Sequence, residues 1–226
     1  MNTCVCAIIL AAGSGSRMKL DITKQRILLG DESVLARTVR IFDSCDSVGS
    51  IIVVTRADEV DFARNAVSGF SKVCSVVIGG ETRAESARLG FLEIPENTDY
   101  VAIHDAARCF ITPDMIEAVV SDAKKYGAAT ASARVTDTVK IVNRDSFISE
   151  TVDRNTLVTV QTPQIFRADL YKKALGCYDG GLNITDDNML LELIGVKPYC
   201  TDTGKHNIKI TTIDDLDFAN YLLNGE

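Results

Sequence analysis

The alternation of short apolar runs with amphipathic stretches most constrains the fold of this 226-residue chain. Four runs are rich in β-branched residues and carry few polar ones: Val5–Leu10, Ser50–Val54, Val73–Ile78 and Tyr100–Ile103. Such runs are typical of strands that are covered on both faces, as in a parallel sheet. We therefore expect these segments to form one buried sheet.

The stretches between the runs have the spacing of helices with one apolar face: Ser33–Cys45, Ala57–Phe70 and Thr82–Leu92. A further helix is expected to begin at Thr112-Pro113-Asp114. Threonine caps helix N-termini, proline suits the first turn, and an acidic residue is favourable at the positive end of the helix dipole.

Strands and helices in this order predict an α/β fold with a Rossmann-like wound, mostly parallel sheet and right-handed crossovers. Ligands of such sheets bind beyond the carboxyl ends of the strands. The loops that follow Leu10, Ile78 and Ile103 are therefore the first candidates for a site.

The alternation of strand-like and helix-like segments ends at about residue 133. Thr138–Val142 and Phe147–Val152 flank the polar segment Asn143-Arg144-Asp145, and this pattern predicts a hairpin. An isolated hairpin is marginal in water, so it either folds back on its own domain or clasps a second chain.

The last third of the chain predicts three helices, at Arg167–Cys177, Thr185–Ile194 and Thr212–Leu223. Short strands are expected near Lys197–Thr201 and Asn207–Ile210. Because no repeat or linker interrupts the pattern, we expect one domain over residues 1–226.

The composition excludes several classes of protein. A net charge of −7 argues against binding to nucleic acid or to anionic membrane, although residues 1–40 hold six Lys/Arg against three acids. Seven cysteines without a CxxC pair and two histidines favour buried free thiols in a reducing cytoplasm over a zinc site. The first apolar run is too short to span a bilayer.

The loop after the first strand, from Ala11 to Met18, has the sequence AAGSGSRM. Glycines let backbone N–H groups approach phosphate oxygens, and Arg17 and Lys24 would add positive charge. The loop matches neither GxxxxGK[ST] nor GxGxxG, so an ordinary strand-to-helix turn is the alternative.

Asp105, in the segment His104-Asp105-Ala106-Ala107-Arg108, follows the fourth apolar run. A carboxylate at this end of a strand is suited to hold Mg²⁺ against phosphates, whereas an Asp–Arg structural pair is the alternative. His104 lacks companions for a metal site and is expected to be structural.

Three further segments carry polar groups beyond what their elements need. Gly79–Ser86 could accept a base or ribose, or could be a turn before a capped helix. Thr151–Asn155 lies near Thr138 and Lys140 across the hairpin, and Lys209 interrupts an apolar pattern where a surface lysine is the default.

Nine motifs occur in a fixed order: AAGSGSRM, TKQ, GGETRAES, HDAAR, TDT, VDRN, QTPQ, ITDD and NIKIT. In this respect the chain resembles, from Val5 to about Leu223, the cytidylyltransferases that convert 2-C-methyl-D-erythritol 4-phosphate to its CDP derivative in isoprenoid synthesis. Ribitol-5-phosphate cytidylyltransferases have the same order of motifs and are the alternative family. The motifs HDAAR and VDRN favour the methylerythritol group.

The resemblance implies a nucleotidyltransferase fold, a cytoplasmic homodimer joined by a β-arm at about residues 136–155, and Mg²⁺ or Mn²⁺ as cofactor. The arm of one subunit would help complete the active site of the other. CTP and a sugar-alcohol phosphate would be the ligands.

It also implies roles for individual residues. The nucleotide would be bound by Ala11, Ala12, Gly13, Gly15, Gly80, Arg83, Ser86 and Ala106. Arg17 and Lys24 would stabilise the transition state, and Asp105 would face metal and substrate. Thr138 and Arg154 of the partner chain, with Lys209, would hold the sugar-alcohol phosphate.

Four positions depart from the family pattern. Thr23 stands where proline is common, Arg26 where an aromatic residue is frequent, Cys109 where proline is usual and His206 where an acid is frequent. Thr23 predicts a less rigid loop around Lys24, and Cys109 and His206 bear on substrate preference.

Overall fold

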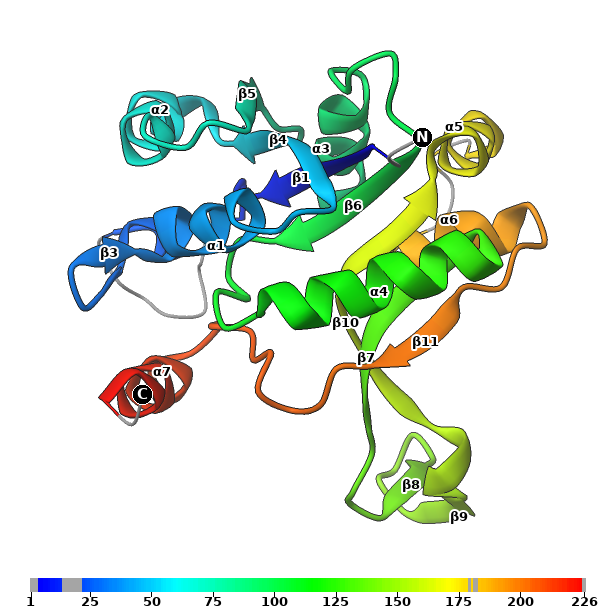
Figure 1. Cartoon of the computed structure of the whole chain (residues 1–226). Coiled ribbons are helices and arrows are strands. Elements are labelled where there is room, and N and C mark those ends of the chain that lie inside the picture. The colour runs from blue at the N-terminus through cyan, green and yellow to red at the C-terminus, as the bar shows by residue number, and fades with distance from the viewer. Residues whose placement is uncertain (1–3, 14–21, 179, 181–182, 225–226) are drawn as a thin grey trace.

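The computed structural model describes residues 4–13, 22–178, 180 and 183–224. Within these residues one sheet of seven strands has the order β11-β7-β10-β6-β1-β4-β5 (Figure 1). In that order the strands are β11 (Tyr199–Asp202), β7 (Ala128–Arg134), β10 (Val158–Arg167), β6 (Tyr100–Asp105), β1 (Val5–Leu10), β4 (Val48–Thr55) and β5 (Val73–Ile78). Only β10 is antiparallel to its neighbours, so the sheet is mostly parallel, as expected.

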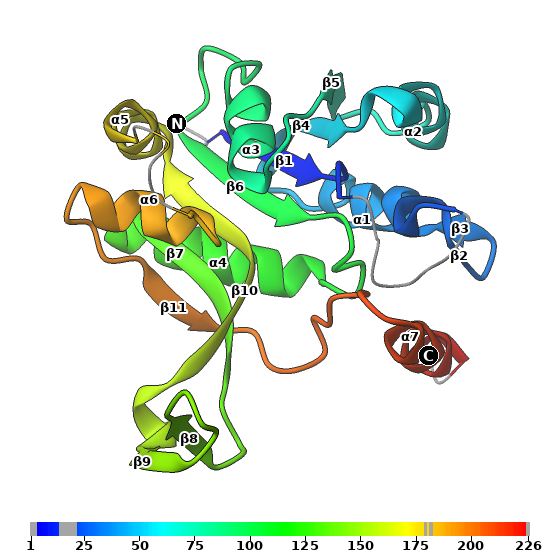
Figure 2. The ribbon, with the colours of Figure 1, turned by 180° about the vertical axis from the view of Figure 1, so that it is seen from behind.

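Helices cover both faces of the sheet. One face packs against α1 (Val34–Asp43), α2 (Val60–Val67) and α4 (Pro113–Tyr126), and the opposite face, seen in Figure 2, against α3 (Arg83–Phe91), α5 (Ala168–Cys177) and α6 (Asp187–Leu193). Strand β1 serves both layers, because Ala7 and Ile9 belong to the first cluster and Cys6 and Ile8 to the second. This alternation explains why the run has no polar residue.

Smaller elements complete the chain. They are η2 (Lys24–Arg26), β2 (Leu28–Leu29), β3 (Glu32–Ser33), η3 (Ala57–Glu59), η4 (Arg154–Thr156) and α7 (Ile213–Asn224). Helix α7 covers a third apolar cluster that includes Ile27, Phe110 and Ile210. No described helix has both the length and the apolar character that crossing a membrane requires.

The expected start of α4 is confirmed. The Thr112 side chain accepts a hydrogen bond from the Met115 N–H, and Pro113 occupies the first turn. Gly127 ends the helix at a φ of 85°, in the left-handed region that glycine adopts without strain.

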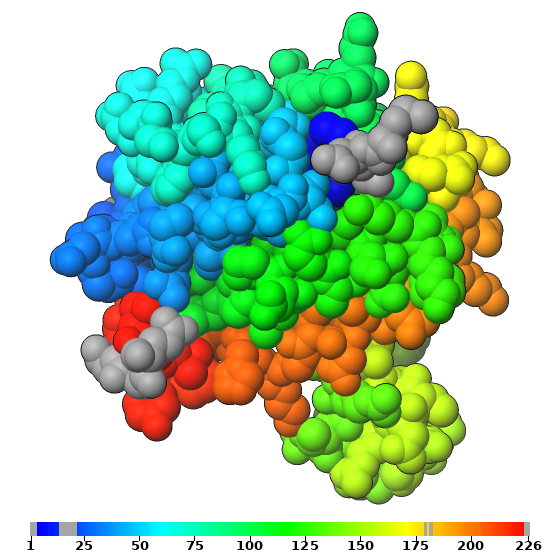
Figure 3. All heavy atoms as spheres, viewed as in Figure 1, coloured from blue at the N-terminus to red at the C-terminus, as the bar shows by residue number. Residues whose placement is uncertain are grey.

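The hairpin is also confirmed. Strands β8 (Val139–Val142) and β9 (Ile148–Val152) form a two-stranded sheet of their own. The hairpin projects from the ends of β7 and β10, and Figure 3 shows it as a lobe set apart from the main body. Several of its large apolar side chains are exposed, with Phe147 at 72% and Ile148 at 65%.

Four strands were not predicted: the two-residue strands β2 and β3, and the main-sheet strands β7 and β10, which lack a strong strand pattern. Strand β7 has the sequence AATASAR, which consists mostly of small residues, and β10 contains Pro163, which usually argues against an interior strand. Conversely, the expected strand at Asn207–Ile210 is absent: the Asn207 amide donates to the Thr162 carbonyl, and Ile210 N–H to Ala107.

The expectation that most cysteines are buried was wrong. All seven lie within the described residues and are free, but only Cys6, Cys45 and Cys109 are buried. Cys74, Cys177 and Cys200 are exposed because they lie at the sheet edges or at a helix end.

Gly90 of α3 allows this helix to approach the sheet. A Cβ there would lie 2.6 Å from Ile8 Cγ2 and 2.8 Å from Val54 Cγ2. We expect Gly90→Ala to lower the free energy of unfolding by about 1–3 kcal/mol through overpacking, as measured by urea denaturation.

Gly176 provides a matched control, because it is also the penultimate residue of its helix and a Cβ there meets nothing within 4 Å. Gly176→Ala should be neutral or stabilising by up to about 1 kcal/mol. Equal effects of the two substitutions would contradict the packing argument.

Candidate functional site

The loops after β1, β5 and β6 meet at one cleft of about 510 Å³. Its lining includes Ala12, Gly13, Lys24, Gln25, Arg56, Gly80, Arg83, Ser86, Asp105, Ala107 and Lys209. The cleft therefore lies beyond the carboxyl ends of the parallel strands, where the sequence predicted a site.

Gly80, which follows Gly79 in the loop after β5, lines the cleft. A Cβ on Gly80 would overlap the Glu85 side chain, and one on Gly79 would lie 2.7 Å from Ser86 Oγ. The Gly80 N–H donates to Ser86 Oγ at 3.1 Å, which holds that hydroxyl beside the loop. A side chain at either position would collide with these protein atoms, so the glycines allow the loop after β5 to pack closely against α3.

Lys24, the first residue of η2, also lines the cleft. A Cβ built on Gly13 would lie 3.7 Å from Lys24 Nζ, so the ammonium is next to the glycine loop. Gln25 Nε2 donates to the Gly13 carbonyl at 3.3 Å and ties η2 to that loop. Gly15 and Arg17, which were expected to act here, lie outside the described residues.

Asp105, the last residue of β6, is held between two cations. Arg83 Nε lies 3.2 Å from Oδ1, and Lys209 Nζ lies 2.6 Å from Oδ2. Burial opposes ionisation of this carboxyl, but Arg83 and then Lys209 outweigh burial and lower the pKa of Asp105 well below its usual range. The carboxylate is therefore charged throughout the physiological range.

A smaller pocket of about 270 Å³ adjoins the cleft. It shares Arg83, Asp105 and Lys209 with the cleft and adds polar residues from other elements: Arg108, Gln161, Thr162, Gln164, Thr185 and Asp186. The three charged residues thus lie where two ligand-sized spaces meet.

Asp187, which contacts Arg83 of this cluster, was given no role in the sequence analysis. Asp187 is fully buried and its Oδ2 lies 2.5 Å from Arg83 Nη1. Asp187 belongs to the motif ITDD, which follows no apolar run. No local sequence pattern therefore predicts that Asp187 lies beside Arg83.

His104 is structural, as expected. Asp105 N–H donates to Thr162 Oγ1, and the Thr162 hydroxyl lies 3.1 Å from His104 Nδ1. Nε2 lies 3.3 Å from the Arg108 carbonyl, which can only accept, so Nε2 carries the proton. This chain of bonds fixes the loop that follows Asp105.

Two alanines expected at the nucleotide lie beneath the cleft. Ala11 N–H donates to the Val54 carbonyl, and Ala106 N–H to Leu10. Both residues are buried, and their neighbours Ala12 and Ala107 line the cleft instead.

Thr138 and Arg154 lie away from the cleft of their own chain. Thr138 is exposed. Arg154 Nη1 donates to the Thr136 carbonyl at 2.6 Å, at the base of the hairpin. Neither residue lines the cleft or the smaller pocket of its own chain, and their role in a partner's site stays a prediction.

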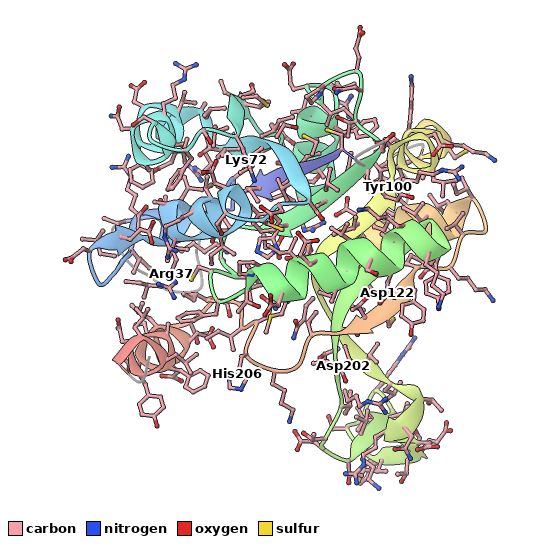
Figure 4. All side chains as sticks on the ribbon, viewed as in Figure 1. Arg37, Lys72, Tyr100, Asp122, Asp202 and His206 are labelled. Atoms are coloured by element: carbon pink, nitrogen blue, oxygen red, sulfur yellow. The ribbon has the colours of Figure 1, made fainter. Side chains whose placement is uncertain are left out.

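The four departures from the family pattern lie outside the cleft lining given above. Thr23 has a φ of −70°, which proline also adopts, so the backbone before Lys24 keeps that shape. Arg26 pairs with Glu59, and Cys109 packs beneath α7. His206 is exposed on the segment before α7 (Figure 4).

The described residues contain no group of three or more His, Cys, Asp or Glu side chains arranged to hold a metal. The carboxylate of Asp105, whose two oxygens are hard donors, lies where the two pockets meet. Mg²⁺ is commonly bound by one or two carboxylates together with substrate phosphates, and Asp105 fits that mode.

Comparison with known proteins reveals full-length relatives. A family model described as 2-C-methyl-D-erythritol 4-phosphate cytidylyltransferase matches residues 5–225. The enzyme of that name from Clostridium acetobutylicum is 40% identical, over 96% of this chain and 96% of its own length. The one from Lachnospira eligens is 38% identical, over the full length of both proteins.

Solved structures give the same result. The 4-diphosphocytidyl-2C-methyl-D-erythritol synthase of Anaerococcus prevotii is 28% identical with a TM-score of 0.88, over 99% of this chain and 100% of that one. The Francisella tularensis 2-C-methyl-D-erythritol 4-phosphate cytidylyltransferase is 32% identical with a TM-score of 0.80, over 96% and 98%.

Acid should weaken the fold through His104. Burial lowers its pKa to about 3, whereas an unfolded histidine titrates at about 6.5. Between these values the unfolded state binds the extra proton, so stability falls as pH drops from 6.5 toward 3. From pH 7 to pH 5 we expect the free energy of unfolding to fall by about 2 kcal/mol. Urea denaturation at each pH measures this change.

His104→Gln cannot titrate and should lose less stability over the same interval. If wild type and His104→Gln respond equally to acid, His104 is not the neutral buried group described here.

Proposed function

The chain belongs to the 2-C-methyl-D-erythritol 4-phosphate cytidylyltransferase family, and we propose that its cleft transfers CMP from CTP to 2-C-methyl-D-erythritol 4-phosphate. The products are 4-diphosphocytidyl-2-C-methyl-D-erythritol and pyrophosphate. The observation that carries this assignment is the cluster of Arg83, Asp105 and Lys209, which two adjoining pockets share.

The larger cleft suits the nucleotide. Gly80, Arg83 and Ser86 line it and would contact the cytidine, with the Ser86 hydroxyl held beside the Gly80 N–H. Gly13 and Lys24 lie on the other side of the cleft, where the triphosphate would extend. Arg17 and Gly15 are proposed to join them, and Ala11 and Ala106 to support the loops from beneath.

The smaller pocket suits the sugar-alcohol phosphate. It combines Lys209 and Arg108 with the hydroxyls of Thr162 and Thr185, and such a set binds a phosphate and its neighbouring hydroxyls. The phosphate monoester is anionic at neutral pH, so its oxygen can attack the α-phosphorus of CTP without a general base.

Positive charge is the main catalytic requirement, because two polyanions must approach each other. Lys24 and Arg17 would stabilise the charge of the pentavalent transition state, and Lys209 would hold the attacking phosphate. When bound, Mg²⁺ or Mn²⁺ would neutralise further phosphate charge. Asp105 is the residue that we propose would hold the metal, with Lys209 directed toward the substrate.

The hairpin is proposed as the dimerisation arm of a one-domain subunit. Its exposed apolar residues Ile141, Phe147 and Ile148 support contact with a second copy. Thr138 and Arg154 would then enter the partner's smaller pocket and contact the sugar-alcohol phosphate. The seven free cysteines are in keeping with a cytoplasmic enzyme.

Substrate choice tests this assignment. Pyrophosphate release from CTP should require 2-C-methyl-D-erythritol 4-phosphate, and ribitol 5-phosphate should support at most weak release. Release with ribitol 5-phosphate alone would overturn the assignment in favour of a polyol-phosphate cytidylyltransferase. Release with neither substrate would indicate a nucleotide-binding module without catalysis.

Subunit sharing of the site predicts complementation. Lys24→Ala should lower kcat by about 10²-fold, because transition-state charge loses a partner, and Arg154→Ala should mainly raise KM for the sugar-alcohol phosphate. A mixed dimer of these two variants contains one intact site, so mixing them should restore part of the activity.

The control is a mixture of two Lys24→Ala preparations carried through the same exchange protocol, which should recover nothing. Absence of recovery in the mixed dimer, with exchange verified by mass spectrometry of tagged subunits, would refute a site shared between subunits.

A further inference from the structure

Asp187 is a buried charge that the proposed chemistry does not use. It is the first residue of α6, has no exposed surface and lines neither pocket described above. A buried carboxylate is costly unless it is paired and hydrogen-bonded, so its partners indicate what it stabilises.

Both carboxylate oxygens and the backbone N–H of Asp187 have defined partners. Oδ1 accepts a hydrogen bond from the Tyr171 hydroxyl at 2.7 Å, and Oδ2 accepts one from Arg83 Nη1 at 2.5 Å. The backbone N–H donates to Gln164 Oε1 at 2.8 Å. The carboxylate is therefore fixed in orientation from three sides.

Tyr171 is itself immobilised. Its ring lies 5.6 Å from that of Phe166 in a stacked pair and 5.1 Å from that of Phe91 in an edge contact. Burial, together with the Asp187 carboxylate, raises the pKa of Tyr171 well above its ordinary value. The hydroxyl thus keeps its proton and always donates.

Arg83 connects this buried pair to the cleft. Its Nη1 is held by Asp187, while its Nε reaches Asp105. A guanidinium bound at one position can pivot, whereas one bound at two positions cannot. Only 26% of the Arg83 side chain is exposed, and that part faces the cleft.

We propose that Asp187, oriented by Tyr171, is a positioning residue that fixes the Arg83 guanidinium for nucleotide binding. This inference rests on the proposed function, in which Arg83 contacts the nucleotide. It assigns the motif Thr185-Asp186-Asp187 and the aromatic core beneath α5 a role in the reaction.

Tyr171→Phe is the informative substitution, because it removes one hydroxyl and leaves the ring in place. Asp187 would then lose one of the bonds that orient its carboxylate and would hold Arg83 less firmly, so KM for CTP should rise about 3- to 10-fold while kcat changes less than about 2-fold, the pattern of lost ground-state binding. Titration calorimetry with CTP gives the same comparison without turnover.

Thr201→Val is the matched control. The buried Thr201 hydroxyl donates to Asp122 Oδ2 at 2.8 Å, a bond of the same type on the far side of the sheet. Figure 4 shows Asp122 on α4, near β11. Thr201→Val should lower stability to a similar extent, by urea denaturation, with an unchanged KM for CTP.

A double-mutant cycle separates positioning from general destabilisation. In an Arg83→Ala background, Tyr171→Phe should leave KM for CTP unchanged, because the residue through which it acts is gone. Independent effects that multiply would overturn the inference.

The remaining outcomes are also distinct. If Arg83→Ala raises KM for CTP and Tyr171→Phe does not, positioning by Asp187 is refuted while the proposed function stands. If Arg83→Ala has no effect on CTP binding, the proposed role of Arg83 is wrong, and the positioning role of Asp187 is refuted with it.

Discussion

The buried carboxylate of Asp105 is the constraint on which the site depends. An ionised carboxyl in a protein interior must be compensated, and here Arg83 and Lys209 compensate it from opposite sides. These residues belong to α3, β6 and the segment before α7, so their pairing ties the two halves of the chain together at the cleft. The arrangement also keeps two cations close to where two anionic substrates would meet.

The sheet topology explains why the ions meet there. Strand β6 lies between β1 and the antiparallel β10, so Asp105 at its carboxyl end faces the loops of both neighbours. Thr162 of β10 fixes the backbone of Asp105, and Gln164 of the same strand fixes Asp187. Strand β10, the one antiparallel strand of the sheet, therefore holds residues of the charged cluster in place. Tyr171 of α5 and Asp187 of α6 extend this hydrogen-bond network to Arg83.

Strands β1, β4, β5 and β6 could be predicted because each carries a local signal. Val5–Leu10 is an apolar run buried between helical layers, and Val73–Ile78 is a run rich in valine that forms a partly buried edge strand; glycines follow both at the cleft. Strands β7 and β10 could not be predicted in the same way. The first consists of small residues and the second contains a proline, and they pair only because neighbouring strands and helices enclose them.

The sequence by itself determined the family, the α/β alternation and the cleft residues Lys24, Gly80, Arg83, Asp105 and Lys209, because each lies in a motif or directly after a strand-like run. Tertiary structure alone decided that Asp187 and Tyr171 stand behind Arg83, and that Ala11 and Ala106 lie beneath the cleft. The reason is physical. Local patterns report which face of an element is apolar, but the partner of a buried charge is chosen by packing between segments that are far apart in the chain, as Arg83 and Asp187 are.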